Sequence, residues 1–356
     1  MKKIIENFSH HLDDYECMWN GIEDIYMNIT GEKIPDQFFF AMSGFCSFAY
    51  IKTNKADIKR MVSFGDGRTK KMYEFLAPIV NFEYRHIECR TPELALAKAK
   101  KEIDKGFPVV IGALDMYYLE YYTKLYYKAH IPFHYVLMIG YDDEEKNIFL
   151  YDCGRKEIIK FSYENLLLGM NAEYKGLCKP NTICTIRMER PNSKKDIFKS
   201  AMKIKTDMFL NPPTKFLGVN GLKKLSKEMI SWEEELGKQE TDKILRSIVE
   251  FCGSVPTTPN RLNGISEKDE VVFMCSRDKM SKVLIELGRE YNNNNLIKSG
   301  ELFKDSGKQF EKLCNIFIDY ILDTKKDMKL ASDVILNIAE IEKNAYQLVS
   351  KGLNEI

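Results

Sequence analysis

The sequence contains no Cys-x-x-Cys pair, no long apolar run, no excess of one charge and no glycine-rich phosphate loop. A membrane-spanning helix needs about 18 or more apolar residues, and the amino terminus carries no signal-peptide core, so we expect a cytoplasmic protein without membrane association. The 53 basic and 52 acidic residues nearly cancel and form no basic stripe with aromatics, so nucleic acid is not an expected partner. Without a phosphate loop, neither ATP nor another cofactor is expected.

The nine cysteines occur singly, and their odd number argues against a disulfide framework. Most of them are expected to be small buried side chains. A zinc site built on Cys178 and Cys184 is a weak alternative, because residues 182–188 have the pattern of a strand. His10 and His11 beside Asp13 and Asp14 could suggest a metal site, but a flexible polar amino terminus is the simpler interpretation. No metal site is therefore predicted.

The chain of 356 residues is longer than a usual single domain, and its character changes near residue 192. Residues 1–192 mix strand and short helix patterns, whereas residues 193–356 carry apolar residues at helical spacing without a fixed repeat. We predict an α+β domain with an antiparallel sheet, followed by an all-helical domain. The Pro- and Thr-rich residues 253–262 interrupt the helices and are a candidate ligand-contact loop.

The clearest pattern is a hairpin in the first domain. Residues 135–141 are apolar or small, residues 142–147 are polar, and residues 148–151 are apolar again, which is typical of two strands and a tight turn. His134 opens the first strand and Asp152 closes the second, so their side chains are predicted to meet across the hairpin. A carboxylate beside an imidazole fixes its tautomer and stabilises its protonated form, as in a catalytic triad.

Cys17 is the candidate nucleophile. Apolar residues at helical spacing begin there and stop at Gly31, which predicts a helix with Cys17 in its first turn. Unpaired backbone N–H groups and the helix dipole favour the thiolate at such a position, and the thiolate is the form that attacks carbonyl carbon. Cys46 and Cys153 are rival nucleophiles, although Cys153 is expected on the strand face opposite to Asp152.

Aromatic residues crowd the stretch that follows a predicted buried strand at residues 107–114. One interpretation is an aromatic core patch. The other is a wall of the substrate cleft, because aromatic rings offer rigid contact area and hydroxyl groups. The residues of this candidate substrate-binding wall are Asp115, Tyr117, Tyr118 and Tyr121.

These stretches together resemble a known family. The matching parts are Cys17 at its helix start, Phe39 to Tyr50, residues 106–111 with 115–121, and residues 134–142 with Asp152. They are similar to the amino-terminal domain of the BtrH-type acyltransferases of butirosin biosynthesis, which are related to papain-like, peptidase C39-like enzymes. Residues from about 215 onward resemble, more weakly, the helical domain of that family.

The resemblance implies a papain-like catalytic domain in residues 1–192 and a helical lid or carrier-binding domain in residues 193–356. It also implies transfer of an acyl group from an acyl- or peptidyl-carrier-protein thioester to a small amine through a Cys17 acyl-enzyme. Similar enzymes form amides in antibiotic assembly such as that of closthioamide. C39-type peptidases place Gln six residues before the Cys, where this sequence has His11. The oxyanion donor therefore stays open between the Cys17 backbone N–H, His11 and Tyr15.

Two other functions stay open. A cysteine peptidase or thioesterase would use the same three residues with water as the acceptor, and a scaffold would use the fold without catalysis. The sequence does not identify the acyl group, the amine, the carrier protein or the oligomeric state.

Overall fold

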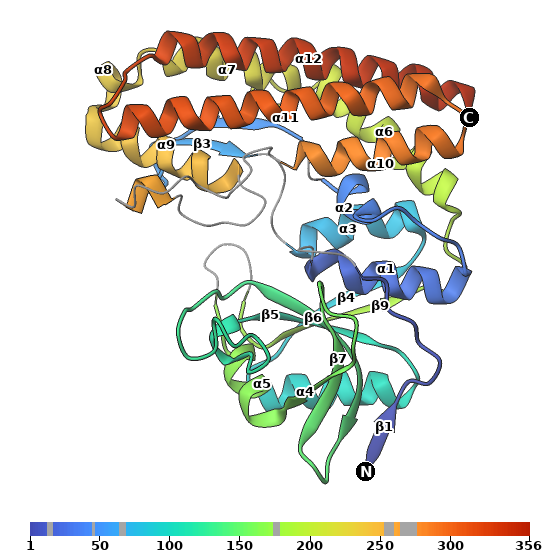
Figure 1. Cartoon of the computed structure of the whole chain (residues 1–356). Coiled ribbons are helices and arrows are strands. Elements are labelled where there is room, and N and C mark those ends of the chain that lie inside the picture. The colour runs from blue at the N-terminus through green and yellow to red at the C-terminus, as the bar shows by residue number, and fades with distance from the viewer. Residues whose placement is uncertain (13–16, 45–46, 64–68, 174–178, 253–259, 264–275) are drawn as a thin grey trace. The chain divides into compact units, whose positions relative to one another are not determined.

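The computed structural model describes residues 1–12, 17–44, 47–63, 69–173, 179–252, 260–263 and 276–356, which belong to two compact units (Figure 1). Unit 1 consists of Met1–Ser43 and Gly67–Ile197, and unit 2 of Gly44–Asp66 and Phe198–Ile356. Unit 1 contains an antiparallel sheet with helices, and the carboxy-terminal part is mostly helical, which confirms the predicted α+β class at this level. The sequence suggested one domain boundary after residue 192. In the structure, residues 44–66 belong to unit 2 although they precede that boundary.

Unit 1 is built on a seven-stranded antiparallel sheet. Its strands are β1 (Lys2–Ile4), β4 (Glu83–Glu88), β5 (Val109–Leu114), β6 (His134–Asp142), β7 (Asn147–Tyr151), β8 (Ile159–Ser162) and β9 (Thr182–Arg187). They follow the order β4-β9-β5-β6-β7-β8, and β1 pairs with β6. The predicted central hairpin is confirmed as β6 and β7, with Leu137 opposite Tyr151.

Helices cover both faces of this sheet (Figure 1). They are α1 (Cys17–Thr30), α2 (Phe38–Met42), α3 (Thr69–Val80), α4 (Pro92–Asp104), the 3₁₀ turn η1 (Met116–Tyr118) and α5 (Tyr163–Met170). On one face, α1 approaches closely at Gly21, where an added Cβ would lie 3.1 Å from Val110 and 3.3 Å from Leu137. On the other face, residues of α4 and α5 form one apolar cluster with Ile111 and Met138.

Local signals account for the helix ends of unit 1. The described part of α1 runs from Cys17 to Thr30, and the helix stops before Gly31, which has a left-handed φ of +68°, as the sequence predicted. Thr91 caps α4 by accepting a hydrogen bond from the Leu94 N–H, and Pro92 occupies the first turn, where its missing N–H costs nothing.

The amino-terminal strand β1 corrects the prediction of a flexible polar terminus. Lys2 lies opposite Asp142 in the antiparallel pairing with β6, and the Ile5 N–H donates to the Ile139 carbonyl at 2.9 Å. At Gly140 an added Cβ would lie 2.6 Å from the Lys3 carbonyl, so glycine is what permits this close approach. The strand completes the edge of β6 beyond the end of β5.

The hairpin of β2 (Ala49–Lys52) and β3 (Arg60–Ser63) belongs to unit 2. The strand β3 pairs antiparallel along the whole of β2, with Ala49 opposite Ser63 and Lys52 opposite Arg60. The Tyr50 N–H donates to the Phe216 carbonyl at 2.8 Å. Local sequence propensity could not predict this pairing, because Phe216 is distant from Tyr50 in the sequence.

The remaining elements of unit 2 are helical, as predicted. They are α6 (Lys194–Leu210), which starts in unit 1, α7 (Gly218–Met229), α8 (Trp232–Leu236), α9 (Lys238–Cys252), the 3₁₀ turn η2 (Asn260–Asn263), α10 (Arg277–Glu290), α11 (Asn294–Ile321) and α12 (Met328–Glu355). The long helices α11 and α12 run side by side (Figure 1). Among the described residues, no helix is long and apolar enough to cross a membrane. Of the predicted contact loop, residues 253–259 lie outside the described part.

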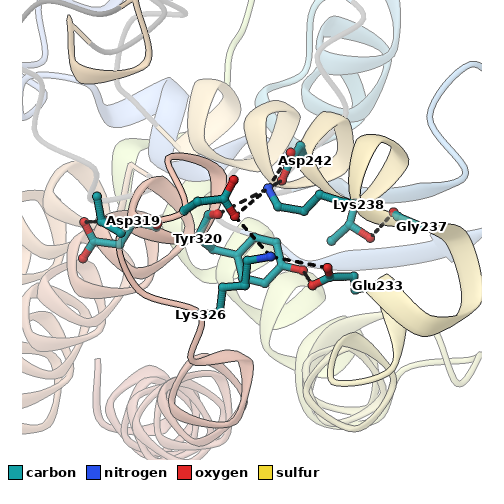
Figure 2. Close-up of polar contacts among 10 residues, drawn as sticks. Glu233, Gly237, Lys238, Asp242, Asp319, Tyr320 and Lys326 are labelled. Carbon is teal, nitrogen blue, oxygen red and sulfur yellow. Dashed lines mark hydrogen bonds and ion pairs between the residues drawn. The ribbon is translucent and has the colours of Figure 1, made fainter.

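A polar cluster joins the ends of α8, α9 and α11 (Figure 2). The ammonium groups of Lys238 and Lys326 lie over the Tyr320 ring, 5.0 and 5.6 Å from its centroid, as cation–π contacts. Its hydroxyl donates to Glu233, and burial together with this carboxylate raises the pKa of Tyr320. Lys238 also pairs with Asp242, and Lys326 pairs with Glu233 and Asp323, so ion pairs around the Tyr320 ring hold these helix ends together.

Replacing Arg277 by methionine is expected to destabilise unit 2 by about 3–5 kcal/mol. Arg277 and Glu342 are fully buried, with Nε 2.6 Å from Oε1 and Nη2 3.0 Å from Oε2, and Ser306 also donates to Oε1. The substitution leaves a buried carboxylate without its counter-charge. Urea unfolding measures the loss, and Lys223→Ala, which removes an exposed ion pair with Glu340, serves as the control at less than about 1 kcal/mol. Equal losses in both variants would contradict this account.

Candidate active site

His134 and Asp152 meet at the open end of the central hairpin. Leu137 faces Tyr151 and Met138 faces Leu150, so continuing the two strands brings residue 152 beside the start of β6. His134 Nε2 lies 2.8 Å from Asp152 Oδ1 and 2.9 Å from Oδ2. Both residues are buried, with 5% and 1% of their surface exposed. The imidazole is therefore held in one orientation by a carboxylate that water does not reach.

Two tyrosines and an arginine surround the carboxylate of Asp152. The Tyr121 hydroxyl donates to Oδ2 at 2.9 Å, and the Tyr122 ring lies edge-on to the His134 ring at a centroid distance of 5.5 Å. The Arg155 guanidinium sits over the Tyr121 and Tyr122 rings at 5.1 and 4.6 Å. Arg155 also donates to the Tyr121 carbonyl at 2.9 Å, which ties the aromatic segment to the end of the hairpin.

Cys17 is the first residue of α1 and is partly exposed, unlike the two buried partners. Cys17 hydrogen-bonds to His134, and this contact raises the pKa of the imidazole. Since His134 Nε2 is occupied by Asp152, Nδ1 is the ring nitrogen left to face the sulfur. The structure thus brings together the three residues selected from the sequence, with the imidazole between a thiol and a carboxylate.

Burial and charge oppose one another at this cluster. Burial alone would raise the pKa of Asp152, but the charge of His134 and hydrogen bonds from the imidazole and two tyrosines lower it. Burial alone would lower the pKa of His134, but the charges of Asp152 and Cys17 and their hydrogen bonds raise it to about 10. The imidazole is therefore protonated at neutral pH and lies between the carboxylate of Asp152 and the sulfur of Cys17.

The raised pKa of His134 predicts that thermal stability falls as pH increases from about 6.5 towards about 10. The folded chain holds this proton more tightly than the unfolded chain, so the stabilisation is complete below the ordinary histidine pKa and is lost as His134 deprotonates. Melting temperatures of the wild type and of His134→Gln across this range measure the effect. The variant should lack this contribution, and parallel pH profiles of the two proteins would contradict the assignment.

Cys153 lies closer to the pair than expected. Its sulfur, a His134 ring nitrogen and an Asp152 carboxylate oxygen are all within 4.8 Å of one another. The expectation that it points to the opposite face is wrong, because β7 ends at Tyr151 and strand alternation no longer governs the next two residues. The other rival nucleophile, Cys46, lies outside the described residues.

The proposed oxyanion residues are only partly described. His11 is held by acidic partners, since its backbone N–H donates to Asp24 at 2.5 Å and its Nε2 lies 3.1 Å from Asp36. His10 Nδ1 lies 2.7 Å from Asp24, whose pKa burial raises despite this neighbour. Two histidines thus tie the amino-terminal segment to α1. Tyr15 lies outside the described residues, so an oxyanion role for either side chain stays a prediction.

The four predicted substrate-binding residues divide between two places. Tyr121 contacts Asp152, whereas Asp115 caps η1 and accepts hydrogen bonds from Tyr117 N–H at 3.0 Å and His130 Nδ1 at 2.6 Å. The Tyr117 ring stacks on His130 at 4.0 Å. Asp115 and Tyr118 line an open hollow of about 570 Å³, whose lining does not include Cys17, His134 or Asp152. The remaining residues of this lining are Pro92, Glu93, Glu164, Leu167, Leu168, Asn171 and Ala172.

Of the two cysteines in the zinc alternative, the structure describes only Cys184. Cys184 lies in β9, as the strand pattern predicted, with its sulfur 3.5 Å from the Tyr84 hydroxyl. Burial raises the pKa of Cys184 to about 12. Cys178 lies outside the described residues.

Fold and site together define a mixed α+β protein with a thiol, an imidazole and a carboxylate gathered in its sheet-containing unit. Residues 16–153 match the family model for butirosin biosynthesis protein H, N-terminal, and residues 173–257 match a domain of unknown function, DUF4872. The chain therefore combines a BtrH N-terminal domain with a DUF4872 domain, which confirms the resemblance drawn from the sequence. The second match starts earlier than the expected residue 215. No curated protein matches this chain.

Proposed function

We propose that this protein is a cysteine-dependent acyltransferase with a papain-like, C39-like amino-terminal domain. In this proposal it forms an amide from a thioester and an amine in natural-product biosynthesis. The observation that carries the proposal is the 2.8 Å contact of Asp152 with His134, whose imidazole also hydrogen-bonds to Cys17. The amino-terminal family is named for biosynthesis of the antibiotic butirosin, which supports a biosynthetic enzyme.

The first half of the reaction transfers the acyl group to Cys17. The Cys17 thiolate attacks the thioester carbonyl, and the carbon–sulfur bond to the carrier breaks as the tetrahedral intermediate collapses. His134 carries a proton at neutral pH and gives it to the departing thiol. Because the thioester is already activated, this step needs no ATP. The backbone N–H of Cys17 is the first candidate for the oxyanion donor, and His11 and Tyr15 are side-chain candidates.

The second half delivers the acyl group to an amine. His134, now neutral, takes a proton from the attacking amine, the amide forms, and the thiolate of Cys17 leaves. Asp152 holds the imidazole and stabilises its positive charge again. The cycle thus returns the thiolate and the protonated histidine to their starting states.

The proposed partners are an acyl or peptidyl carrier protein and a small amine. Water competes with the amine for the acyl-enzyme, so a transferase must exclude it. In this proposal the carboxy-terminal part acts as a lid or carrier-binding domain. A peptidase or thioesterase remains the alternative, because the same three residues also serve hydrolysis.

Partition of the acyl-enzyme between water and amine tests the proposal. The probes are acyl N-acetylcysteamine thioesters, which mimic the carrier thioester, with and without a panel of primary amines. A transferase forms amide faster than free acid, and the amide fraction rises with amine concentration. Free acid as the sole product at every amine concentration would favour the hydrolase. Absence of both turnover and an acyl adduct would favour a scaffold.

A further inference from the structure

A second thiol stands beside the His134–Asp152 pair. The sulfur of Cys153 lies within 4.8 Å of a ring nitrogen and of a carboxylate oxygen, and these two also lie within that distance of each other. The proposed reaction uses Cys17, which leaves Cys153 without a role.

We propose that His134, Asp152 and Cys153 form a binding site for a thiophilic divalent cation such as Zn²⁺, and that metal binding there switches the protein off. Thiolate sulfur, imidazole nitrogen and carboxylate oxygen are the three ligand types that Zn²⁺ takes from proteins. Three protein ligands with a water in the fourth position make a complete tetrahedral set. Acidic clusters that favour Mg²⁺ or Ca²⁺ contain no thiol, so the sulfur selects the softer metals.

The spacing of the three atoms suits such an ion after small side-chain shifts. Zinc–ligand bonds of roughly 2.0–2.3 Å place tetrahedral ligand atoms roughly 3–4 Å apart. The present separations are at most 4.8 Å, while the 2.8 Å contact between His134 and Asp152 must open slightly to admit the ion. The Tyr121 hydroxyl, at 2.9 Å from the carboxylate, supplies the outer-shell hydrogen bond that orients a metal-binding aspartate.

Metal binding and acyl transfer are mutually exclusive in this arrangement. The ion takes the Nε2 lone pair of His134 and a carboxylate oxygen of Asp152, and one proton of the imidazolium and the proton of the Cys153 thiol pass to solvent. The metal-bound imidazole keeps its proton on Nδ1 and has no free lone pair, so it cannot take up the proton of the attacking amine. The inhibition rests on the proposed function, whereas the binding of the ion does not.

Cobalt absorption tests the binding without reference to activity. The full-length protein is titrated with Co²⁺ alone, and a thiolate-to-cobalt charge-transfer band is expected in the near ultraviolet. Cys153→Ser should abolish the band and weaken Zn²⁺ competition by at least about 100-fold. Cys17→Ser should retain it, and Cys89→Ser is the matched control, because Cys89 is another partly exposed free cysteine of unit 1. Loss of the band in Cys17→Ser, its persistence in Cys153→Ser, or no band in the wild type would overturn the proposal.

X-ray absorption of the zinc-loaded wild type keeps the test independent of variant folding. One sulfur with nitrogen or oxygen ligands is expected around the ion, and a shell with no sulfur or with two would refute the site. Zn²⁺ should also inhibit thioester turnover in the wild type and in Cys89→Ser but not in Cys153→Ser. If no turnover is found at all, the proposed function fails while the absorption results still decide the metal site.

Discussion

Replacing Cys17 by alanine is expected to lower the rate of amide formation by about 10⁴- to 10⁶-fold, the range found when the nucleophile of a catalytic triad is removed. Cys17 is the partly exposed thiol that hydrogen-bonds to the buried imidazole, so no other group holds its position at the start of α1. Initial rates with an acyl N-acetylcysteamine thioester and a primary amine measure the loss. The acyl adduct should disappear with it.

The matched control for this variant is Cys89→Ala. Cys89 is also a partly exposed free cysteine of unit 1, and it follows β4 rather than opening α1. Its variant should keep the wild-type rate, and circular dichroism should show the same fold for both variants. Wild-type turnover in Cys17→Ala would show that another thiol is the nucleophile. Among the described residues, Cys153 would be the candidate, because its sulfur lies within 4.8 Å of a His134 ring nitrogen.

Replacing Asp152 is expected to give the second largest effect, and the size should depend on the substitute. Asp152→Ala removes both the orientation and the charge that His134 receives, so a loss of about 10⁴-fold in kcat is expected. Asp152→Asn keeps an oxygen for His134 Nε2, as papain-like enzymes with Asn in this role do, and should lose less than Asp152→Ala. Steady-state rates of the two variants show how much of the effect of Asp152 on kcat comes from its charge and how much from its orientation of His134.

The pH profile of Asp152→Asn carries a second expectation. The charge of Asp152 is the main force that raises the pKa of His134 to about 10 against the opposing effect of burial. Without that charge burial prevails, so the alkaline limb of kcat/KM should move to lower pH. An alkaline limb at the same pH in wild type and Asp152→Asn would contradict the role given to this carboxylate.

Local patterns were sufficient to predict the elements that carry the candidate site. Helical spacing from Cys17 and the stop at Gly31 predicted the helix α1 and its end at Thr30. The apolar, polar and apolar runs of the hairpin set the register that places His134 beside Asp152. Such signals succeed because helix caps and short turns are determined by residues close in sequence.

Pairings between distant segments were not predictable from local patterns. The strand β1 is only three residues long, and its partner β6 lies more than 130 residues away, so no period marks it. The segment 44–66 joins unit 2 through contacts of Tyr50 with Phe216 and Glu228. Tertiary packing decides both cases, and propensity carries no record of it.

Part of the site was also missed. The aromatic stretch indicated a role near the cleft, yet it did not show that Tyr121 binds Asp152 or that Tyr122 faces His134. Arg155 gave no signal, since a lone arginine after a strand is ordinary. Cys153 was assigned to the wrong face because the alternation rule was extended beyond the end of β7 at Tyr151.

The central claim is that the sulfur of residue 17 carries the acyl group. The most direct measurement is peptide mapping by mass spectrometry after rapid mixing with an acyl N-acetylcysteamine thioester and acid quench. The account predicts acyl mass on the peptide that contains Cys17, and its loss when a primary amine is added before the quench. Acyl mass on the peptide that contains Cys153, or on neither peptide while amide accumulates, would contradict it.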